Sequence, residues 1–339
     1  MSANAPRRDG ALLEARGGTT AINLNGLSFA KKKLEDLALA LFPLAAMDPA
    51  GGADELQAFF ARHGYVFFRS LIPRSLVLDA RLEILQKYAI IGEIDDREPV
   101  QLGKSTPRTF RSAINVRALR QSIVSGYYFQ AVSRARQVQE IASALLCHDA
   151  IMLDYLWPRM APPGSGTALH QDAPFLKGPP PEALVSVWTP LGDIDPSEGA
   201  LVILAGSHYD SQLQVEYGSK DTDVEPDFGW YDTDLSRARA RIGGTWLTAD
   251  FKAGDVIFFD LMTLHGTFDN NSRENVRLSS DSRYQSSAFP IHPRWRGASA
   301  PGRSPNRVFL PQATTLETLD NKGLSTEFHE VDELGMIVG

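Results

Sequence analysis

A series of short β-prone segments in the second half of the chain is the feature that most constrains its fold. Each segment is rich in β-branched, aromatic or other apolar residues, and turn-forming residues separate it from the next one. This arrangement is typical of a β-sandwich or a jelly roll. We therefore predict a mainly β protein with flanking helices. The segments lie at 151–157, around His170, and at 185–189, 201–204, 256–259 and 276–285.

The first half of the chain is expected to be mostly helical. Apolar residues recur at helical spacing before Gly64, a residue type that commonly ends a helix, and again after Pro73. A short β-prone run separates these two helices. The predicted helices cover residues 53–63, 75–91 and 118–146, and the β-prone run covers 65–68.

These patterns predict one folded domain that follows an extension. Residues 1–20 are rich in Ala, Arg and Gly and show little periodicity, as is common at chain termini. We expect a partly mobile N-terminal extension at 1–50 and a single domain at 51–339, with helical support at 51–150, a jelly-roll core at 151–289 and a C-terminal wrap at 290–339.

Charge and hydropathy exclude two classes of partner. The formal net charge is −7 over 339 residues, which offers no broad basic surface for nucleic acid. No apolar run is long enough to span a membrane, and residues 1–18 lack the apolar region of a secretory signal. We expect a cytoplasmic protein that acts on a small molecule, and the sequence is compatible with a homo-oligomer.

Cys147 is the only cysteine of the chain. A single cysteine excludes an intrachain disulfide, a zinc site built from cysteines and a four-cysteine iron–sulfur cluster. Any metal must therefore be bound by nitrogen and oxygen atoms.

His170, Asp172 and His265 are the candidate metal ligands. His170 and Asp172 are two positions apart, so in an extended strand both side chains point to the same face. His265 lies 95 positions after His170, and tertiary structure must bring it to the other two. Two imidazoles and one carboxylate on one face of an octahedral ion leave three positions open, which suits Fe(II) oxygen chemistry.

The context of the His-x-Asp pair decides between a metal site and a surface pair. An isolated match is more often a surface or capping pair, because short motifs recur by chance. Here His265 ends an apolar segment at 256–264 that has the pattern of a buried strand, and Arg277 follows 12 positions later. This context favours metal binding.

Together these residues form part of an ordered series of motifs that resembles the phytanoyl-CoA dioxygenase family of Fe(II)/2-oxoglutarate-dependent oxygenases. The resemblance implies a cupin-like double-stranded β-helix core, Fe(II) as the metal, 2-oxoglutarate as co-substrate, O2 as oxidant, and succinate and CO2 as co-products. It also implies hydroxylation, or another oxidation, of a C–H bond in a small organic molecule such as a natural-product intermediate. The motifs are Gly64-Tyr65-Val66, His170-Gln171-Asp172, Trp188-Thr189-Pro190-Leu191, Glu198-Gly199-Ala200-Leu201, Gly206-Ser207-His208, Gly254-Asp255, His265-Gly266-Thr267, Arg277 and Arg283-Tyr284.

The resemblance also suggests which residues bind the co-substrate. Arg277 is expected to bind the distal carboxylate of 2-oxoglutarate, because a planar guanidinium engages a carboxylate through two parallel hydrogen bonds. Thr267 is placed to help hold the same carboxylate, and Trp188 to form a wall beside it, although core packing is nearly as good an explanation for Trp188. Lys104 is a further candidate in a polar stretch where solvated charges are the simpler explanation.

The substrate-binding residues are the least determined part of the sequence. Arg283 is placed either to meet an acidic substrate group or to pair with Asp281. Trp230 and Tyr231 lie in a long segment at 209–250 without regular periodicity, which is typical of a lid or a binding loop.

Two other functions remain compatible with the same three ligands. One is a jelly-roll binding protein that keeps the metal only for structure, although such a site has no need of Arg277. The other is a metal-dependent hydrolase in which an ion such as zinc activates water.

Overall fold

The computed structural model describes residues 52–106, 116–176, 178–222, 224–225 and 229–297, together with four short strand segments at 21–24, 27–30, 330–331 and 337–338. The predicted N-terminal extension and C-terminal wrap fall mostly outside these residues. Among the described residues, no helix is long and apolar enough to cross a membrane.

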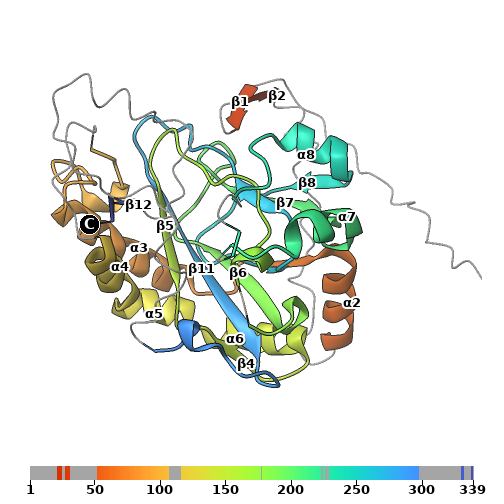
Figure 1. Ribbon diagram of the computed structural model, residues 1–339. Helices are drawn as coiled ribbons and strands as arrows, with labels where there is room; N and C mark the ends of the chain where they lie inside the picture. The colour runs from red at the N-terminus through yellow and green to blue at the C-terminus, as the bar shows by residue number, and fades with distance from the viewer. Residues whose placement is uncertain are drawn as a thin grey trace, which may run out of the picture.

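Two antiparallel sheets form the centre of the molecule (Figure 1). In the described part of the chain, the larger sheet has the strand order β3-β9-β6-β11-β4, with β5 also paired to β11, and the smaller sheet has the order β10-β7-β8. The mainly β core with flanking helices is therefore confirmed. The strands are β3 (Tyr65–Phe68), β4 (Ala150–Met152), β5 (Trp157–Ala161), β6 (Leu184–Pro190), β7 (Leu201–Ala205), β8 (Thr245–Leu247), β9 (Val256–Asp260), β10 (His265–Thr267) and β11 (Arg277–Ser286), with the hairpins β1 (Ala21–Leu24)–β2 (Leu27–Ala30) and β12 (Glu330–Val331)–β13 (Ile337–Val338).

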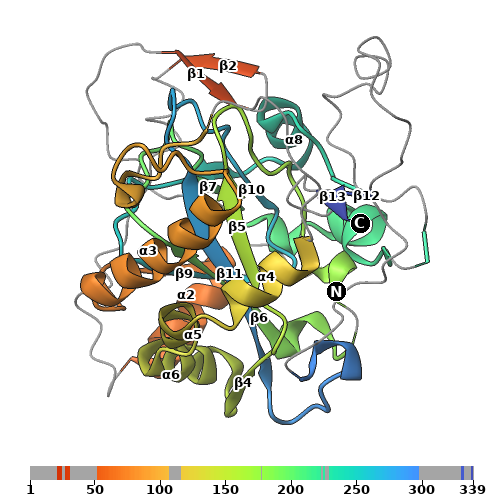
Figure 2. The same cartoon turned by 90° about the vertical axis from the view of Figure 1, so that its left-hand side faces the viewer.

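The helices before β4 form a layer over one face of the larger sheet (Figure 2). Tyr284 of β11 faces this layer, and its hydroxyl donates a hydrogen bond of 2.9 Å to the carbonyl of Ser133. The helices are α2 (Ala53–His63), α3 (Arg74–Ile90), α4 (Val116–Val124), α5 (Tyr127–Ser133), α6 (Arg136–Leu146), α7 (Ser211–Leu213) and α8 (Leu235–Ile242), with short 3₁₀ turns at Val100–Leu102, Ala173–Phe175, Pro181–Ala183, Ser207–Tyr209 and Pro293–Trp295 and a π-helical turn at Gln214–Gly218.

The predicted helical stretch at 118–146 is confirmed, and the structure divides it into the three helices α4, α5 and α6. The Glu83 carboxylate accepts hydrogen bonds from the backbone N–H groups of Tyr127, Tyr128 and Phe129. A carboxylate at this position satisfies the free donors of a new helix N-terminus, and Gly126 leaves room for it.

Two predicted strands are each divided in the structure. The segment 151–157 leaves the sheet after β4, where the Asp154 N–H donates to the carbonyl of Trp295, and it returns as β5. The apolar segment 256–264 turns after β9, because the Asp260 carboxylate accepts a hydrogen bond of 2.7 Å from the Met262 N–H. His265 therefore begins β10 in the smaller sheet and does not end a strand of the larger one.

Gly254 is required by a close approach of two backbones. Its φ is +106°, and a Cβ atom there would lie 2.4 Å from the carbonyl oxygen of Ile72. We expect Gly254→Ala to lower the free energy of unfolding by about 2–4 kcal/mol, since backbone strain and a steric clash act together. The midpoint of urea unfolding would measure this loss.

Gly92→Ala is the matched control for that change. Gly92 also has a positive φ, +77°, but nothing lies within 4 Å of a Cβ atom placed there. Gly92→Ala should therefore cost only the backbone term of about 1–2 kcal/mol. Equal losses in the two variants would show that the Ile72 carbonyl does not matter.

Candidate metal centre

The three predicted metal ligands meet on the interior side of the two sheets. His170 and His265 face each other across an antiparallel bridge, in which their backbones exchange hydrogen bonds of 2.8 and 2.9 Å. Asp172 follows in a helical conformation and leads into the 3₁₀ turn at Ala173–Phe175. The three side chains are buried, and their ligand atoms lie within 4.8 Å of one another.

Asp172 reaches the histidines by a bend and not by the pleat of a continuous strand. The sequence predicted that His170 and Asp172 lie on one face of an extended segment. The structure shows extended pairing at His170, whereas Asp172 has φ −75° and ψ −27°. The convergence was predicted correctly, but the local geometry that produces it was not.

Backbone carbonyls fix both imidazole rings. The Nδ1 atom of His170 lies 2.9 Å from the carbonyl oxygen of Ala168, and that of His265 lies 2.9 Å from the carbonyl oxygen of Thr263. Because a carbonyl can only accept, each Nδ1 carries the proton and each Nε2 presents a lone pair. The two Nε2 atoms lie 3.8 and 3.9 Å from Oδ1 of Asp172, so one small ion can contact all three atoms.

The electrostatics of the site favour the protonation states that bind a metal ion, which are neutral imidazoles and an ionised carboxylate. Burial lowers the pKa of both imidazoles, and that of His170 falls well below its ordinary value, with a further contribution from His265 beside it. Burial alone would raise the pKa of Asp172, but the charge of the Arg283 guanidinium and a hydrogen bond from Ser186 hold this pKa below its usual range. At neutral pH the site therefore offers two neutral imidazoles and one carboxylate.

One row of residues across neighbouring strands supports these ligands. Arg283 of β11 pairs in register with Ser186 of β6, which pairs with Phe259 of β9. Arg283 and Ser186 both donate to Oδ2 of Asp172, at 2.6 and 2.5 Å, and the Phe259 ring packs against His265 with centroids 4.5 Å apart. Strand register therefore holds the metal ligands in place.

The structure corrects the expected role of Arg283. This residue was a candidate for binding an acidic substrate group or for pairing with Asp281. Instead it is buried against Asp172, with its guanidinium 4.7 Å from the ring centroid of Trp157, and Asp281 pairs with Arg159. Arg283 therefore contacts a candidate metal ligand.

Arg277 is a buried guanidinium without a carboxylate partner among the described residues. Only 3% of it is exposed, and its polar contacts are Ser279 Oγ at 2.8 Å and Thr267 Oγ1 at 3.4 Å. Its Nε atom has no hydrogen-bond partner in the described part of the chain. Burial, and then the charge of Arg159, lowers the pKa of Arg277 to about 10, which leaves it charged at neutral pH.

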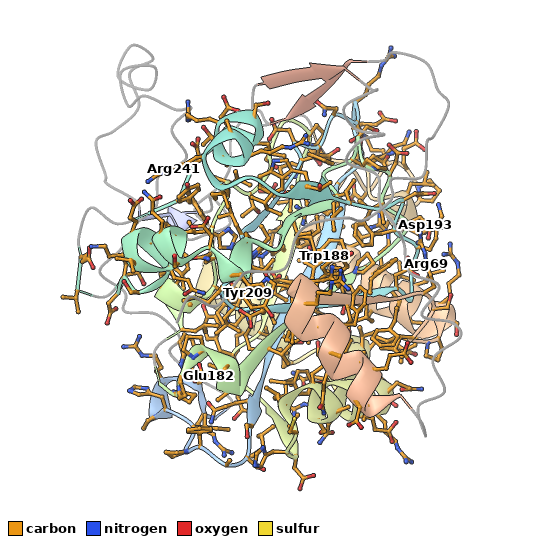
Figure 3. All side chains as sticks on the ribbon, turned by 90° about the vertical axis from the view of Figure 1, so that its right-hand side faces the viewer. Arg69, Glu182, Trp188, Asp193, Tyr209 and Arg241 are labelled. Atoms are coloured by element: carbon orange, nitrogen blue, oxygen red, sulfur yellow. The ribbon has the colours of Figure 1, made fainter. Side chains whose placement is uncertain are left out.

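Thr267 contacts Arg277, and Trp188 is a buried residue of β6, and each of them also has other packing or hydrogen-bonding partners. The Thr267 hydroxyl oxygen also accepts a hydrogen bond of 2.8 Å from the Thr167 N–H. Trp188 is two positions after Ser186 on β6, so the two side chains share the interior face. Its ring packs against Phe251 at 4.8 Å, and it lies deep among the interior side chains (Figure 3).

Within the described part of the segment 209–250, Trp230 is the aromatic side chain that reaches the site. Trp230 contacts the His170 ring edge-on, with centroids 5.1 Å apart. Tyr231 instead packs against Tyr217 at 5.5 Å, while its N–H donates to the carbonyl of Leu169. We therefore keep Trp230 as a substrate-side candidate, and Tyr231 acts in docking this segment onto the strand that carries His170.

Lys104 does not reach the site. Its ammonium group pairs with Glu274 at 3.0 Å and with Glu98 at 3.5 Å, near the surface. These two carboxylates give Lys104 a solvated ion-pair role, and we no longer place it at the co-substrate.

Two residues at the site were not singled out from the sequence. Phe175 packs edge-on against His170, with centroids 5.7 Å apart, and Ser186 binds Asp172. The available signal for Ser186 was a lone hydroxyl between Val185 and Val187 in a fully buried strand. A buried hydroxyl usually has a polar partner, so a hydroxyl at this position indicates a polar group in the interior.

Comparison with known proteins identifies one family model that matches this chain, the phytanoyl-CoA dioxygenase (PhyH) model, over residues 60–278. The chain is 30% identical to peroxisomal phytanoyl-CoA dioxygenase from Bos taurus over 118 residues, which are 33% of each chain, and 29% identical to the Homo sapiens protein over the same share. The match thus spans about a third of the length of these curated relatives.

A solved structure shows the same fold. The epimerase SnoN, crystallised with Fe3+, alpha ketoglutarate and nogalamycin RO, superposes with a TM-score of 0.50 at 19% identity, covering 74% of this chain and 88% of SnoN.

Proposed function

This chain belongs to the phytanoyl-CoA dioxygenase (PhyH) family, and from that premise we propose that it is an Fe(II)- and 2-oxoglutarate-dependent oxygenase of a small organic molecule. The overall reaction would consume substrate, O2 and 2-oxoglutarate and release hydroxylated substrate, succinate and CO2. The observation that carries the proposal is the converged His170, Asp172 and His265 triad, together with a buried Arg277 that has no carboxylate hydrogen-bonded to it among the described residues and that contacts Thr267 on the strand of His265.

The donor set fits iron. Two neutral imidazole nitrogens and one carboxylate oxygen form the facial arrangement that non-haem Fe(II) oxygenases use, whereas calcium and magnesium prefer sites made of oxygen. When bound, the iron would supply the reaction of O2 with 2-oxoglutarate. The protein would hold His170 and His265 through their Nδ1 hydrogen bonds and keep Asp172 ionised through Arg283.

Arg277 is the proposed anchor of 2-oxoglutarate. Burying a guanidinium costs folding free energy unless an anion pairs with it. The distal carboxylate of 2-oxoglutarate would be such an anion. Thr267 and Ser279 already contact Arg277 and would orient its fork. Trp188 would help to exclude water on the same interior face.

Phe175 and Trp230 are proposed to border the substrate. Both rings meet His170 edge-on, and they lie 6.2 Å apart between centroids. Apolar rings beside the metal would exclude water and position a C–H bond, and we propose hydroxylation as the outcome.

Anaerobic titration tests the proposal directly. Adding 2-oxoglutarate to the Fe(II)-loaded protein should produce a weak visible charge-transfer band, because the keto acid chelates the metal. The same protein loaded with Zn(II) should bind 2-oxoglutarate without this band. Stoichiometric Fe(II) binding with no band on adding 2-oxoglutarate would favour a hydrolytic or purely structural metal site.

A further inference from the structure

We propose that Arg283 and Ser186 are positioning residues that hold Asp172 as a one-oxygen ligand and so keep a coordination position open for the co-substrate. This inference rests on the proposed function. It concerns the geometry of the carboxylate and not its charge.

Both donors act on the same oxygen atom of Asp172. The Ser186 hydroxyl donates to Oδ2 at 2.5 Å, and the Arg283 guanidinium meets the same Oδ2 at 2.6 Å. The other oxygen, Oδ1, faces the Nε2 atoms of His170 and His265 at 3.8 and 3.9 Å. The two carboxylate oxygens therefore have separate tasks, one toward the protein and one toward the metal.

We call the two donors Arg283 and Ser186 the clamp on Asp172. The clamp is rigid because its two donors come from paired strands. Arg283 and Ser186 are directly opposite each other in the β11–β6 ladder. The guanidinium is also packed over the Trp157 ring, at 4.7 Å from its centroid. Rotation of Asp172 toward two-oxygen binding would break both hydrogen bonds inside a buried site, which is costly.

A one-oxygen carboxylate matters for the number of open positions. A six-coordinate ion with two histidines and one carboxylate oxygen keeps three positions, enough for a chelating keto acid and O2 together. If both oxygens of Asp172 bound the metal, one of these positions would be lost. The co-substrate would then have to displace a carboxylate oxygen in order to chelate.

The charge of Arg283 has a separate effect that the test must exclude. A guanidinium near the site repels a divalent cation and attracts an anion such as 2-oxoglutarate, so its removal changes affinity through charge alone. Ser186 carries no charge. The decisive variant is therefore Ser186→Ala, and Ser186→Thr, which retains the hydroxyl, is its rescue.

The experiment measures anaerobic 2-oxoglutarate binding to the Fe(II) protein and the visible spectrum of the Co(II) protein, which reports the number of ligands. Loss of a hydrogen bond to a metal ligand typically costs about 10- to 100-fold, so we expect Ser186→Ala to weaken 2-oxoglutarate binding at least about tenfold. The Co(II) spectrum should shift toward higher coordination. Ser186→Thr should restore the 2-oxoglutarate affinity and the Co(II) spectrum of the wild type. Arg283→Met should weaken 2-oxoglutarate binding more than Ser186→Ala does.

Arg69→Met is the matched control. Arg69 forms a pair of 2.5 Å with the buried carboxylate of Asp255, which is not part of the triad, and its own side chain is more exposed than that of Arg283 and lies toward the edge of the molecule (Figure 3). This variant should leave the Co(II) spectrum and 2-oxoglutarate affinity unchanged.

The outcomes separate this proposal from the proposed function. If Ser186→Ala matches wild type in both readouts, the clamp is overturned, even if Arg283→Met is impaired, because that pattern reflects charge. If wild-type Fe(II) protein itself fails to bind 2-oxoglutarate, the proposed function fails, and the Co(II) spectra of the variants alone then decide whether the clamp exists.

Discussion

His265→Ala should abolish substrate-stimulated succinate release while the protein remains folded. The variant removes one of two nitrogen ligands, so Fe(II) would be held by His170 and Asp172 alone. We expect the rate to fall by at least about three orders of magnitude, equivalent to roughly 4 kcal/mol of transition-state stabilisation. Succinate release would be measured under saturating Fe(II) and 2-oxoglutarate, and circular dichroism would verify the fold.

His208→Gln is the control for that variant. His208 is a buried histidine whose Nε2 lies 2.9 Å from the carbonyl oxygen of Ala61, and it is not part of the triad. A glutamine side chain can still donate a hydrogen bond, so turnover should persist. Normal succinate release from His265→Ala, with loss in His208→Gln, would show that the metal site had been assigned to the wrong histidine.

The candidate metal ligands could be predicted from the sequence because their signals are local. His170 and Asp172 are two positions apart, and a histidine after a strongly apolar run is a simple pattern. Such patterns consist of residue types and spacing. They remain valid even when the local conformation is predicted wrongly. This is why the triad was found, although Asp172 bends into a 3₁₀ turn and His265 begins a separate strand.

The partners of these ligands could not be predicted, because they depend on strand register. Arg283 lies 97 positions after Ser186, and only the β6–β11 pairing places both beside Asp172. A slip of one residue would turn either side chain to the opposite face of the sheet. Without the register, Arg283 was indistinguishable from a residue that meets an acidic substrate.

Lys104 shows a different limit of sequence reasoning. Its partners Glu98 and Glu274 are 6 and 170 positions away, so the ion-pair network that occupies it combines a local and a distant carboxylate. A lysine near a site in the sequence is often part of a solvated ion pair. Only the three-dimensional structure distinguishes such an ion pair from a contact to the co-substrate. Arg277 differs from Lys104 because, in the part of the chain that the structure describes, it is buried and forms no ion pair with a carboxylate.

Arg277→Met should raise the concentration of 2-oxoglutarate required for turnover. The change keeps the aliphatic length of the side chain but removes the guanidinium that would bind the distal carboxylate. Hydrogen bonds to a charged group contribute about 1.5–3 kcal/mol, so we expect the apparent KM for 2-oxoglutarate to rise roughly 10- to 100-fold. The maximal rate at saturating 2-oxoglutarate should fall less, because the metal ligands are intact.

Arg277→Met should not lower the free energy of unfolding. A raised KM for 2-oxoglutarate without a loss of stability would identify the charge of Arg277 as functional. Burial lowers the pKa of Arg277 from 12.5 to about 10, so at neutral pH the folded protein holds a cation that is better solvated when unfolded. Because the depressed pKa disfavours the charged form in the folded state, this penalty is present below pH 10 and diminishes above it. Urea unfolding at pH 7 should therefore show Arg277→Met to be at least as stable as wild type.

Two further variants test whether the guanidinium itself is responsible. Arg277→Lys retains a charge but lacks the planar fork, so its KM for 2-oxoglutarate should lie between those of wild type and Arg277→Met. Added methylguanidinium should partly restore turnover in Arg277→Ala, because the shorter side chain leaves space for it. Arg81→Met is the control, because Arg81 is a partly buried arginine that donates to the carbonyl of Leu191. An unchanged 2-oxoglutarate requirement in Arg277→Met would move the anchor to Arg159, the other guanidinium that acts electrostatically on both His170 and Arg277.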